Sequence, residues 1–220
     1  LTESDDLRLI ARITRSQIKR LRDAGVRTCA DLVASGPVPR IGSDVLARLR
    51  RQARLQIASR PLPKPAFEVL PHEPDKRVGL AALPQASHGD VFFDLEGFPL
   101  AEGGLEYLFG AVTAKGDTPE FHDWWAHDAA EEKAAFEQVV DWLHARWQKD
   151  PAMHIYHYAP YEVTALRRLM GKYATREAEV DDLLRGEVLV DLFAVTRAGV
   201  AIGTSGYSLK DIEVIFSPPR

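Results

Sequence analysis

The chain has 220 residues, 45% of them hydrophobic, and a formal net charge of −4, so it can form one good-sized domain or two small ones. No apolar run approaches the roughly 20 residues of a membrane-spanning helix, which excludes a transmembrane protein and predicts no membrane partner. The single cysteine, Cys29, excludes internal disulfides and fits a reducing, cytoplasmic location; we expect it to pack as a small apolar residue.

Charge is divided unevenly along the chain. Residues 1–60 carry 13 Lys and Arg against 6 Asp and Glu, whereas residues 61–220 carry 15 against 26. Twelve of the 13 basic residues in the first segment are arginines, whose guanidinium group matches phosphate bidentately. The division suggests a segment that binds a polyanion beside one that binds cations, although a helical segment with solvated arginines would have the same composition.

Residues 1–60 are predicted to be helical from the spacing of their apolar residues. Gly25 is placed to end one helix at its C′ position, and Thr28 is placed to cap the next, over residues 29–34. A turn follows, and Ser43 or Asp44 is then placed to cap a longer helix that continues to about residue 59.

The turn and the longer helix resemble a helix-hairpin-helix unit, in which main-chain N–H groups of a glycine-containing hairpin and flanking basic side chains hold a nucleic-acid backbone. Arg40-Ile41-Gly42 matches the hairpin in part, with Arg40 in the place of its first glycine. The resemblance implies nucleic-acid contacts by Arg40, Arg48 and Arg51. A small helical spacer is the alternative.

Residues 61–87 contain six prolines and little periodicity, which predicts an extended linker or a strand-and-loop segment lying along the next domain. From residue 88 onward strand and helix patterns alternate. We expect strands over 91–95, 105–113, 120–125, 154–158 and 188–192, and helices over 129–148, 161–170, 176–184 and from Ser208. This order resembles the ribonuclease-H-like fold: an α/β domain with a mixed sheet, a three-strand meander first and flanking helices, here expected over residues 88–220.

Two carboxylates, Asp94 and Glu96, end an apolar run and precede Gly97. Side chains two residues apart on a strand project from the same face, so these carboxylates are expected to lie together. They repel each other unless a cation lies between them, and hard divalent ions such as Mg²⁺ or Mn²⁺ take oxygen ligands. A solvated edge strand is the alternative, but apolar residues on both faces before Asp94 favour a buried central strand.

Glu162 is predicted in the first turn of a helix that follows a strand, where the helix macrodipole stabilises an anion. A purely stabilising role is therefore one interpretation. The stretch also resembles the second motif of DEDD-family 3′→5′ exonucleases, with Tyr161-Glu162 and Leu166 in its places and Glu instead of Asp.

Taken together, five blocks of the sequence resemble the YprB-type, ribonuclease-H-like DEDD exonuclease domain over about residues 88–216. The blocks are Phe93-Asp94-Leu95-Glu96-Gly97, Glu106-Tyr107-Leu108-Phe109-Gly110, Tyr156 to Glu162, Val190-Asp191-Leu192 and Tyr207-Ser208-Leu209-Lys210. In larger relatives this domain lies between a RecB-like nuclease region and a superfamily-1 helicase, after a helix-hairpin-helix-like segment. The resemblance implies these regions as partners within a longer protein.

The resemblance implies two divalent ions, Mg²⁺ or Mn²⁺, held by four carboxylates: one activates the attacking water and the other stabilises the leaving 3′ oxygen. Asp94, Glu96 and Glu162 would be three of the ligands. The fourth, an Asp in a Tyr-Asn-x-x-Asp motif, is missing before the sequence ends at Ser217-Pro218-Pro219-Arg220. We therefore expect a C-terminally truncated domain, and an inactive fragment is the alternative to an active one because this ligand is missing. Asp191 is a further catalytic candidate, although in this family its position more often supports the sheet or caps the next segment.

The implied activity is metal-dependent 3′→5′ exonuclease action on single-stranded nucleic acid, with DNA expected as the substrate rather than RNA. Phe98, Tyr158 and Tyr161 would stack on terminal bases, and Lys210 would contact phosphate unless it is an ordinary surface lysine. The alternative is a catalytically degenerate scaffold whose basic N-terminal segment binds nucleic acid.

Overall fold

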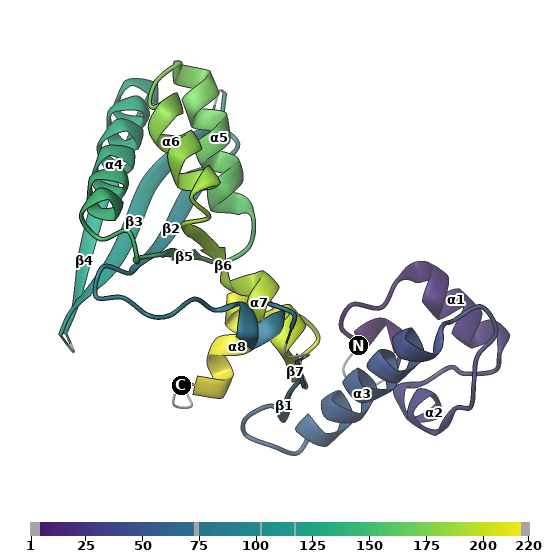
Figure 1. Cartoon of the computed structure of the whole chain (residues 1–220). Helices are drawn as coiled ribbons and strands as arrows, with labels where there is room; N and C mark the ends of the chain where they lie inside the picture. The colour runs from purple at the N-terminus through teal and green to yellow at the C-terminus, as the bar shows by residue number, and fades with distance from the viewer. Residues whose placement is uncertain (1–4, 73–74, 102, 117, 217–220) are drawn as a thin grey trace. The chain divides into compact units, whose positions relative to one another are not determined.

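The computed structural model describes residues 5–72, 75–101, 103–116 and 118–216. The chain divides into two compact units (Figure 1): unit 1 contains residues 1–81 and 196–220, and unit 2 contains residues 82–195. The segment from Ser217 to Arg220, where the expected fourth carboxylate motif is missing from the sequence, lies outside the described residues.

Unit 2 is built on a five-stranded mixed sheet with the strand order β4-β3-β2-β5-β6. The strands are β2 (Val91–Phe98), β3 (Leu105–Lys115), β4 (Thr118–Trp125), β5 (Ile155–His157) and β6 (Leu189–Asp191). Strand β2 is central, antiparallel to β3 and parallel to β5. The predicted α/β fold, with a meander first and its opening strand in the centre, is confirmed.

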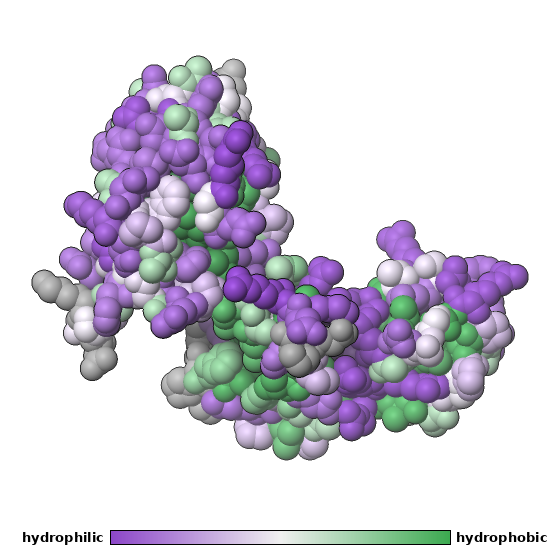
Figure 2. Space-filling model, in the orientation of Figure 1, coloured by the Kyte–Doolittle hydropathy of each residue, from purple (hydrophilic) through white to green (hydrophobic). Residues whose placement is uncertain are grey.

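Three helices cover one face of this sheet: α4 (Ala129–Lys149), α5 (Tyr161–Tyr173) and α6 (Glu177–Arg185) (Figure 1). The side of β2 that carries Val91, Phe93 and Leu95 packs in their core. The expectation that both faces of β2 are buried is wrong, because Phe92 on the other face is 52% exposed. The outer surface over these helices is mostly hydrophilic (Figure 2), since their apolar stripes face the sheet.

Unit 1 contains η1 (Leu7–Leu9), α1 (Arg15–Asp23), α2 (Cys29–Ala34), α3 (Ser43–Ser59), η2 (Gly79–Ala82) and α8 (Leu209–Phe216). Thr28 caps α2 through a capping box, and Gly25 adopts φ 83° after α1, both as predicted. The N-cap of α3 is Gly42, so the prediction of Ser43 or Asp44 as the cap is wrong by one residue or two. Cys29 packs in the helical core, and burial and the nearby Asp5 raise the pKa of its thiol to about 11.

A two-stranded antiparallel sheet joins the beginning and end of unit 1. It pairs β1 (Phe67–Val69), from the proline-rich stretch, with β7 (Val200–Ile202), which follows α7 (Leu192–Gly199). The strand-and-loop alternative for residues 61–87 is thus present in part. The structure also groups residues 196–216 with the N-terminal helices, whereas the sequence predicts one domain over 88–220. Among the described residues, no helix has the length and apolar character needed to cross a membrane.

Candidate functional site

Asp94 and Glu96 lie on the exposed face of β2, as their two-residue spacing predicts. Asp94 Oδ1 accepts a hydrogen bond from the amide of Leu95 at 3.0 Å. The strand therefore presents two carboxylates side by side to solvent at the centre of the sheet, and they belong to its exposed face rather than to its core.

Steric crowding explains why a glycine, Gly97, follows this pair of carboxylates. The register of β2 against β3 shifts between Glu96 and Gly97, which marks a β-bulge. A β-carbon on Gly97 would lie 2.3 Å from Glu106 Oε2 and 2.4 Å from the hydroxyl oxygen of Tyr161. Glycine thus leaves room for two polar side chains to meet against the end of the strand.

A pocket of about 590 Å³ opens at this end of β2. Its lining includes Glu96, Phe98, Glu106, Tyr161 and Arg168. The residues Phe98 and Tyr161 are 50% and 46% exposed, so a planar group entering the pocket can contact them. The pocket thus combines a predicted metal-binding carboxylate with two accessible aromatic rings and a guanidinium group.

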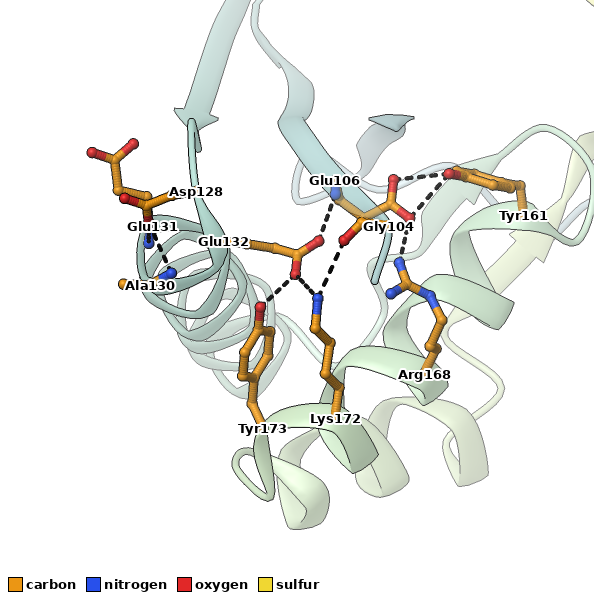
Figure 3. A network of polar contacts seen from close by, with 10 residues as sticks. All are labelled: Gly104, Glu106, Asp128, Ala130, Glu131, Glu132, Tyr161, Arg168, Lys172 and Tyr173. Atoms are coloured by element: carbon orange, nitrogen blue, oxygen red, sulfur yellow. Dashed lines mark hydrogen bonds and ion pairs between the residues drawn. The ribbon is translucent and has the colours of Figure 1, made fainter. Parts of the chain in front are cut away.

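A buried carboxylate, Glu106, organises the side chains of this pocket (Figure 3). It is 4% exposed and accepts hydrogen bonds from the Tyr161 hydroxyl at 2.8 and 3.0 Å and from Arg168 Nη2 at 2.5 Å. Burial and the adjacent Glu106 carboxylate raise the pKa of Tyr161 to about 12. The phenol therefore stays protonated at neutral pH and remains a donor to Glu106.

A second buried carboxylate, Glu132 of α4, holds the other end of α5 (Figure 3). It is fully buried and accepts hydrogen bonds from Lys172 Nζ at 2.6 Å, from the Tyr173 hydroxyl at 2.5 Å and from the amide of Glu106 at 2.5 Å. Burial raises the pKa of Glu132, but these hydrogen bonds outweigh it and hold the pKa below its ordinary value.

Sequence reasoning missed both carboxylates as site residues. Glu132 lies on the apolar stripe of α4, three and four residues before the buried Ala135 and Phe136, and a charge on such a stripe is a usable signal. Glu106 has no comparable signal, because a glutamate in a strand is ordinarily solvated.

Glu162, in the first turn of α5, is 2% exposed, and its Oε2 atom has no hydrogen-bond partner. The His157 ring lies beside it: Nδ1 is 3.4 Å from that oxygen but only 2.7 Å from the carbonyl oxygen of Ala159. One N–H cannot serve both acceptors well, and the shorter contact takes it. Burial lowers the pKa of His157, but Glu162, the Ala159 carbonyl and Asp191 together raise it above its ordinary value.

Asp191, at the end of β6, acts on the backbone. Its Oδ1 accepts hydrogen bonds from the amides of Ala159 at 3.0 Å, Phe193 at 2.9 Å and Ala194 at 3.3 Å. It thereby caps α7 and fixes the turn after β5, which is the capping role that the sequence resemblance gives as the more frequent one for this position.

The predicted ligands do not form one cluster: within the part of the chain that the structure describes, no three His, Cys, Asp or Glu side chains are grouped closely enough to hold a metal ion. Asp94 and Glu96 are exposed on β2, whereas Glu162 is buried at the start of α5. The donors nevertheless suit a hard divalent cation, because all are carboxylate oxygens and Glu162 Oε2 is buried without a donor.

The predicted nucleic-acid contacts are divided between the units. Phe98 and Tyr161 line the pocket of unit 2, and Tyr158 packs edge-on against Phe193, with ring centroids 5.6 Å apart. The remaining four, all in unit 1, are Arg40, Arg48, Arg51 and Lys210.

Those four basic residues differ in their surroundings. Lys210 and Arg40 are exposed, whereas Arg48 is partly buried. Arg51 is engaged by a carboxylate, because its Nε is 3.6 Å from Glu68 Oε2.

Comparison with known families gives one match, to the RNase_H superfamily, over residues 91–219. No curated protein and no solved structure matches the chain. The matched region begins at the first residue of β2 and includes Asp94, Glu96 and Glu162. Members of this superfamily are usually nucleases that process nucleic acids, and many use divalent metal ions. Because the match covers more than half of the chain, the chain belongs to the ribonuclease H superfamily.

Proposed function

We propose that the chain contains a metal-dependent 3′→5′ exonuclease domain that hydrolyses phosphodiester bonds of single-stranded nucleic acid, DNA above RNA. The observation that carries this proposal is the pair Asp94 and Glu96 on the exposed face of the central strand of a ribonuclease H superfamily domain. In the DEDD exonucleases that the sequence resembles, the first two catalytic carboxylates occupy this position.

Asp94, Glu96 and Glu162 are the residues that would hold Mg²⁺ or Mn²⁺. When bound, divalent ions in such a site activate a water molecule and neutralise charge on the leaving oxygen. The support for Glu162 is its buried oxygen without a donor, because leaving a buried charged group unsatisfied is costly unless another ligand satisfies it. Asp191 is not included, since Oδ1 of its carboxylate already holds three backbone amides.

The pocket beside Glu96 is the proposed site for the terminal nucleotide. The exposed rings of Phe98 and Tyr161 offer stacking surfaces for a base, and such stacking tolerates any sequence because every base has a π-face. Arg168 has five N–H donors. One donates to Glu106, and others can donate to a phosphate oxygen. Glu106 therefore orients both the ring and the guanidinium group.

We also propose that residues 1–60 form a helix-hairpin-helix-like nucleic-acid-binding segment before an exonuclease domain over residues 88–220. The backbone of Arg40 supports this, since its φ of 63° is the left-handed conformation that favours the glycine of such a hairpin. By the same resemblance, the domain would work beside a RecB-like nuclease region and a superfamily-1 helicase of a longer protein, and the single cysteine fits a cytoplasmic location.

The test is digestion of a single strand labelled at its 5′ end, with Mn²⁺ or with EDTA. Wild type should shorten the strand stepwise from its 3′ end with Mn²⁺ only, and Asp94→Asn should abolish this. Asp123→Asn is a matched control, because Asp123 and Asp94 both pair with Gly110 of β3 and so face the same side of the sheet. The control should remain active, and loss of activity in both variants would contradict the assignment.

A second candidate function is a binding module with a degenerate nuclease fold. The observation that favours it is the lack, among the described residues, of a group of three side chains able to hold a metal ion. A wild-type chain that binds the labelled strand but leaves it intact with Mn²⁺ would establish this second function and exclude the first.

A further inference from the structure

Three arginines from distant parts of the sequence come together in unit 1. Arg12 follows η1, Arg48 lies on α3, and Arg197 lies near the end of α7. Arg12 Nη1 donates a hydrogen bond to the carbonyl oxygen of Arg197 at 3.0 Å. Arg12 and Arg197 are exposed and Arg48 is partly buried, so a ligand in solution can reach the cluster.

Buried polar side chains hold the frame around this cluster. The guanidinium carbon of Arg12 is 6.0 Å from the ring centroid of Tyr207, which is 6% exposed and donates to the carbonyl oxygen of Val200 at 3.1 Å. Gln52, one turn after Arg48 on α3, is 4% exposed and donates to the carbonyl oxygen of Ile202 at 2.6 Å. The three segments that supply the arginines are therefore tied together by hydrogen bonds.

The backbone at Arg12 is itself unusual. Its φ of 63° lies in the left-handed region, where a residue with a β-carbon is strained and glycine is not. Gln56 fixes the segment before it, accepting from the amide of Ala11 at 3.1 Å and donating to the carbonyl oxygen of Leu9 at 2.7 Å. An arginine is thus held in a conformation that glycine would adopt more easily, which points to a use for its side chain.

Charge distinguishes Arg12 and Arg48 from two neighbouring arginines of α3. Arg51 and Arg54 of α3 both contact Glu68, at 3.6 and 2.6 Å, and are neutralised by it. By contrast, no carboxylate of the described residues forms an ion pair with Arg12 or Arg48.

The arginines also affect one another. Partial burial lowers the pKa of Arg12 and of Arg48, and the neighbouring cations lower each pKa further: Arg197 acts on Arg12, while Arg12 and Arg197 act on Arg48. Arg12 and Arg48 nevertheless stay charged at neutral pH. Neighbouring like charges repel each other, and an anion placed between them would relieve that repulsion.

We propose that Arg12, Arg48 and Arg197 form a phosphate-binding site for a nucleic-acid backbone. Guanidinium groups match phosphate oxygens bidentately, and three of them on a fixed frame suit a chain of phosphates. The choice of nucleic acid as the ligand rests on the proposed function. The site differs from the hairpin expected around Arg40, and it assigns no role to Arg51, which Glu68 already neutralises.

The test measures binding of a fluorescein-labelled single strand to the full chain by anisotropy, in EDTA and over a range of salt concentrations. We expect the double variant Arg12→Gln/Arg48→Gln to weaken binding about tenfold and to reduce the salt dependence by about 0.7 in slope for each phosphate that it no longer neutralises. Arg54→Gln is the matched control, since it removes the same charge from the same helix and Glu68 already neutralises Arg54. It should bind as wild type does.

Circular dichroism and the thermal unfolding midpoint check that each variant is folded. Arg48→Gln alone removes no hydrogen bond within the described residues, so it serves if the double variant does not fold, and it should weaken binding about threefold. Unchanged affinity in folded variants, or an equal loss in Arg54→Gln, would overturn the site. A different result would contradict the proposed exonuclease function: a chain that binds the strand but does not cut it with Mn²⁺.

Discussion

The hydroxyl oxygen of Tyr161 lies 2.8 Å from the carboxylate of Glu106, and both groups occupy space that a side chain on the intervening strand would need. This bond joins the first residue of α5 to β3 across the end of β2. It fixes one wall of the proposed nucleotide pocket and keeps the ring of Tyr161 available for stacking.

Gly97→Ala should separate the two groups. The added β-carbon would lie within 2.4 Å of both, and the ends of two flexible side chains can move away, so we expect a stability loss of only about 1 kcal/mol. Exonuclease activity should fall markedly in a variant that is still folded. KM should rise by a larger factor than kcat falls. Gly171→Ala in α5 is the control, because nothing lies within 4 Å of its β-carbon; equal activity in both variants would contradict the prediction.

Tyr161→Phe and Tyr161→Ala should have different effects. The first removes only the hydroxyl donor of Glu106 and should cost about 1 kcal/mol of stability with little change in strand affinity. The second also removes the 46%-exposed ring and should weaken strand binding by about 1–3 kcal/mol. Anisotropy with a labelled strand, alongside urea unfolding, separates the two effects; equal affinities would mean that the ring does not stack on a base.

Glu132→Gln should make stability depend less on pH. The pKa of Glu132 is lowered in the folded chain, so its stabilisation is complete above the ordinary glutamate value of 4.5 and is lost as pH falls through the lowered pKa. We expect the variant to be about 2 kcal/mol less stable at neutral pH, because the neutral amide no longer balances the charge of Lys172. The difference should shrink below pH 4.5 in urea titrations. The exposed Glu120 provides the control variant, Glu120→Gln, which should match wild type throughout.

Glu162→Gln should abolish Mn²⁺-dependent cleavage without lowering stability in EDTA. The Oε2 atom that it replaces has no hydrogen-bond donor, and a neutral amide costs less to bury than a carboxylate. Mn²⁺ should raise the unfolding midpoint of wild type, because a ligand that binds only the folded chain stabilises it. Neither Glu162→Gln nor Asp94→Asn should show this rise. Full activity in Glu162→Gln would remove this residue from the metal site.

Regular elements of this fold are readable in the sequence. The strand that carries Asp94 and Glu96 and the long amphipathic α4 are confirmed, because each repeats its pattern over enough residues to show a period. The cap of α2 by Thr28 is confirmed as well, because capping depends on neighbours in the chain.

Features that depend on distant contacts were not readable. Strands β1 and β7 lie outside the alternating strand and helix pattern, and they pair only with each other across 130 residues of the chain. Glu106 looks like a solvated strand residue until Tyr161 and Arg168 of α5 are placed against it. Arg12 and Arg48 are 36 positions apart in sequence, and nothing local relates them.

Polar contacts at the two ends of α5 couple the position of Glu162 to the contacts of Glu132. Glu162 lies in its first turn, and Lys172, bonded to Glu132, lies ten residues later, about 15 Å along the axis. A tilt of only about 5° about the far end would displace the Glu162 carboxylate by roughly 1 Å, which is enough to spoil metal coordination. Substitutions of Glu132, which lies outside the lining of the proposed nucleotide pocket, would then reduce catalysis in a chain that is still folded.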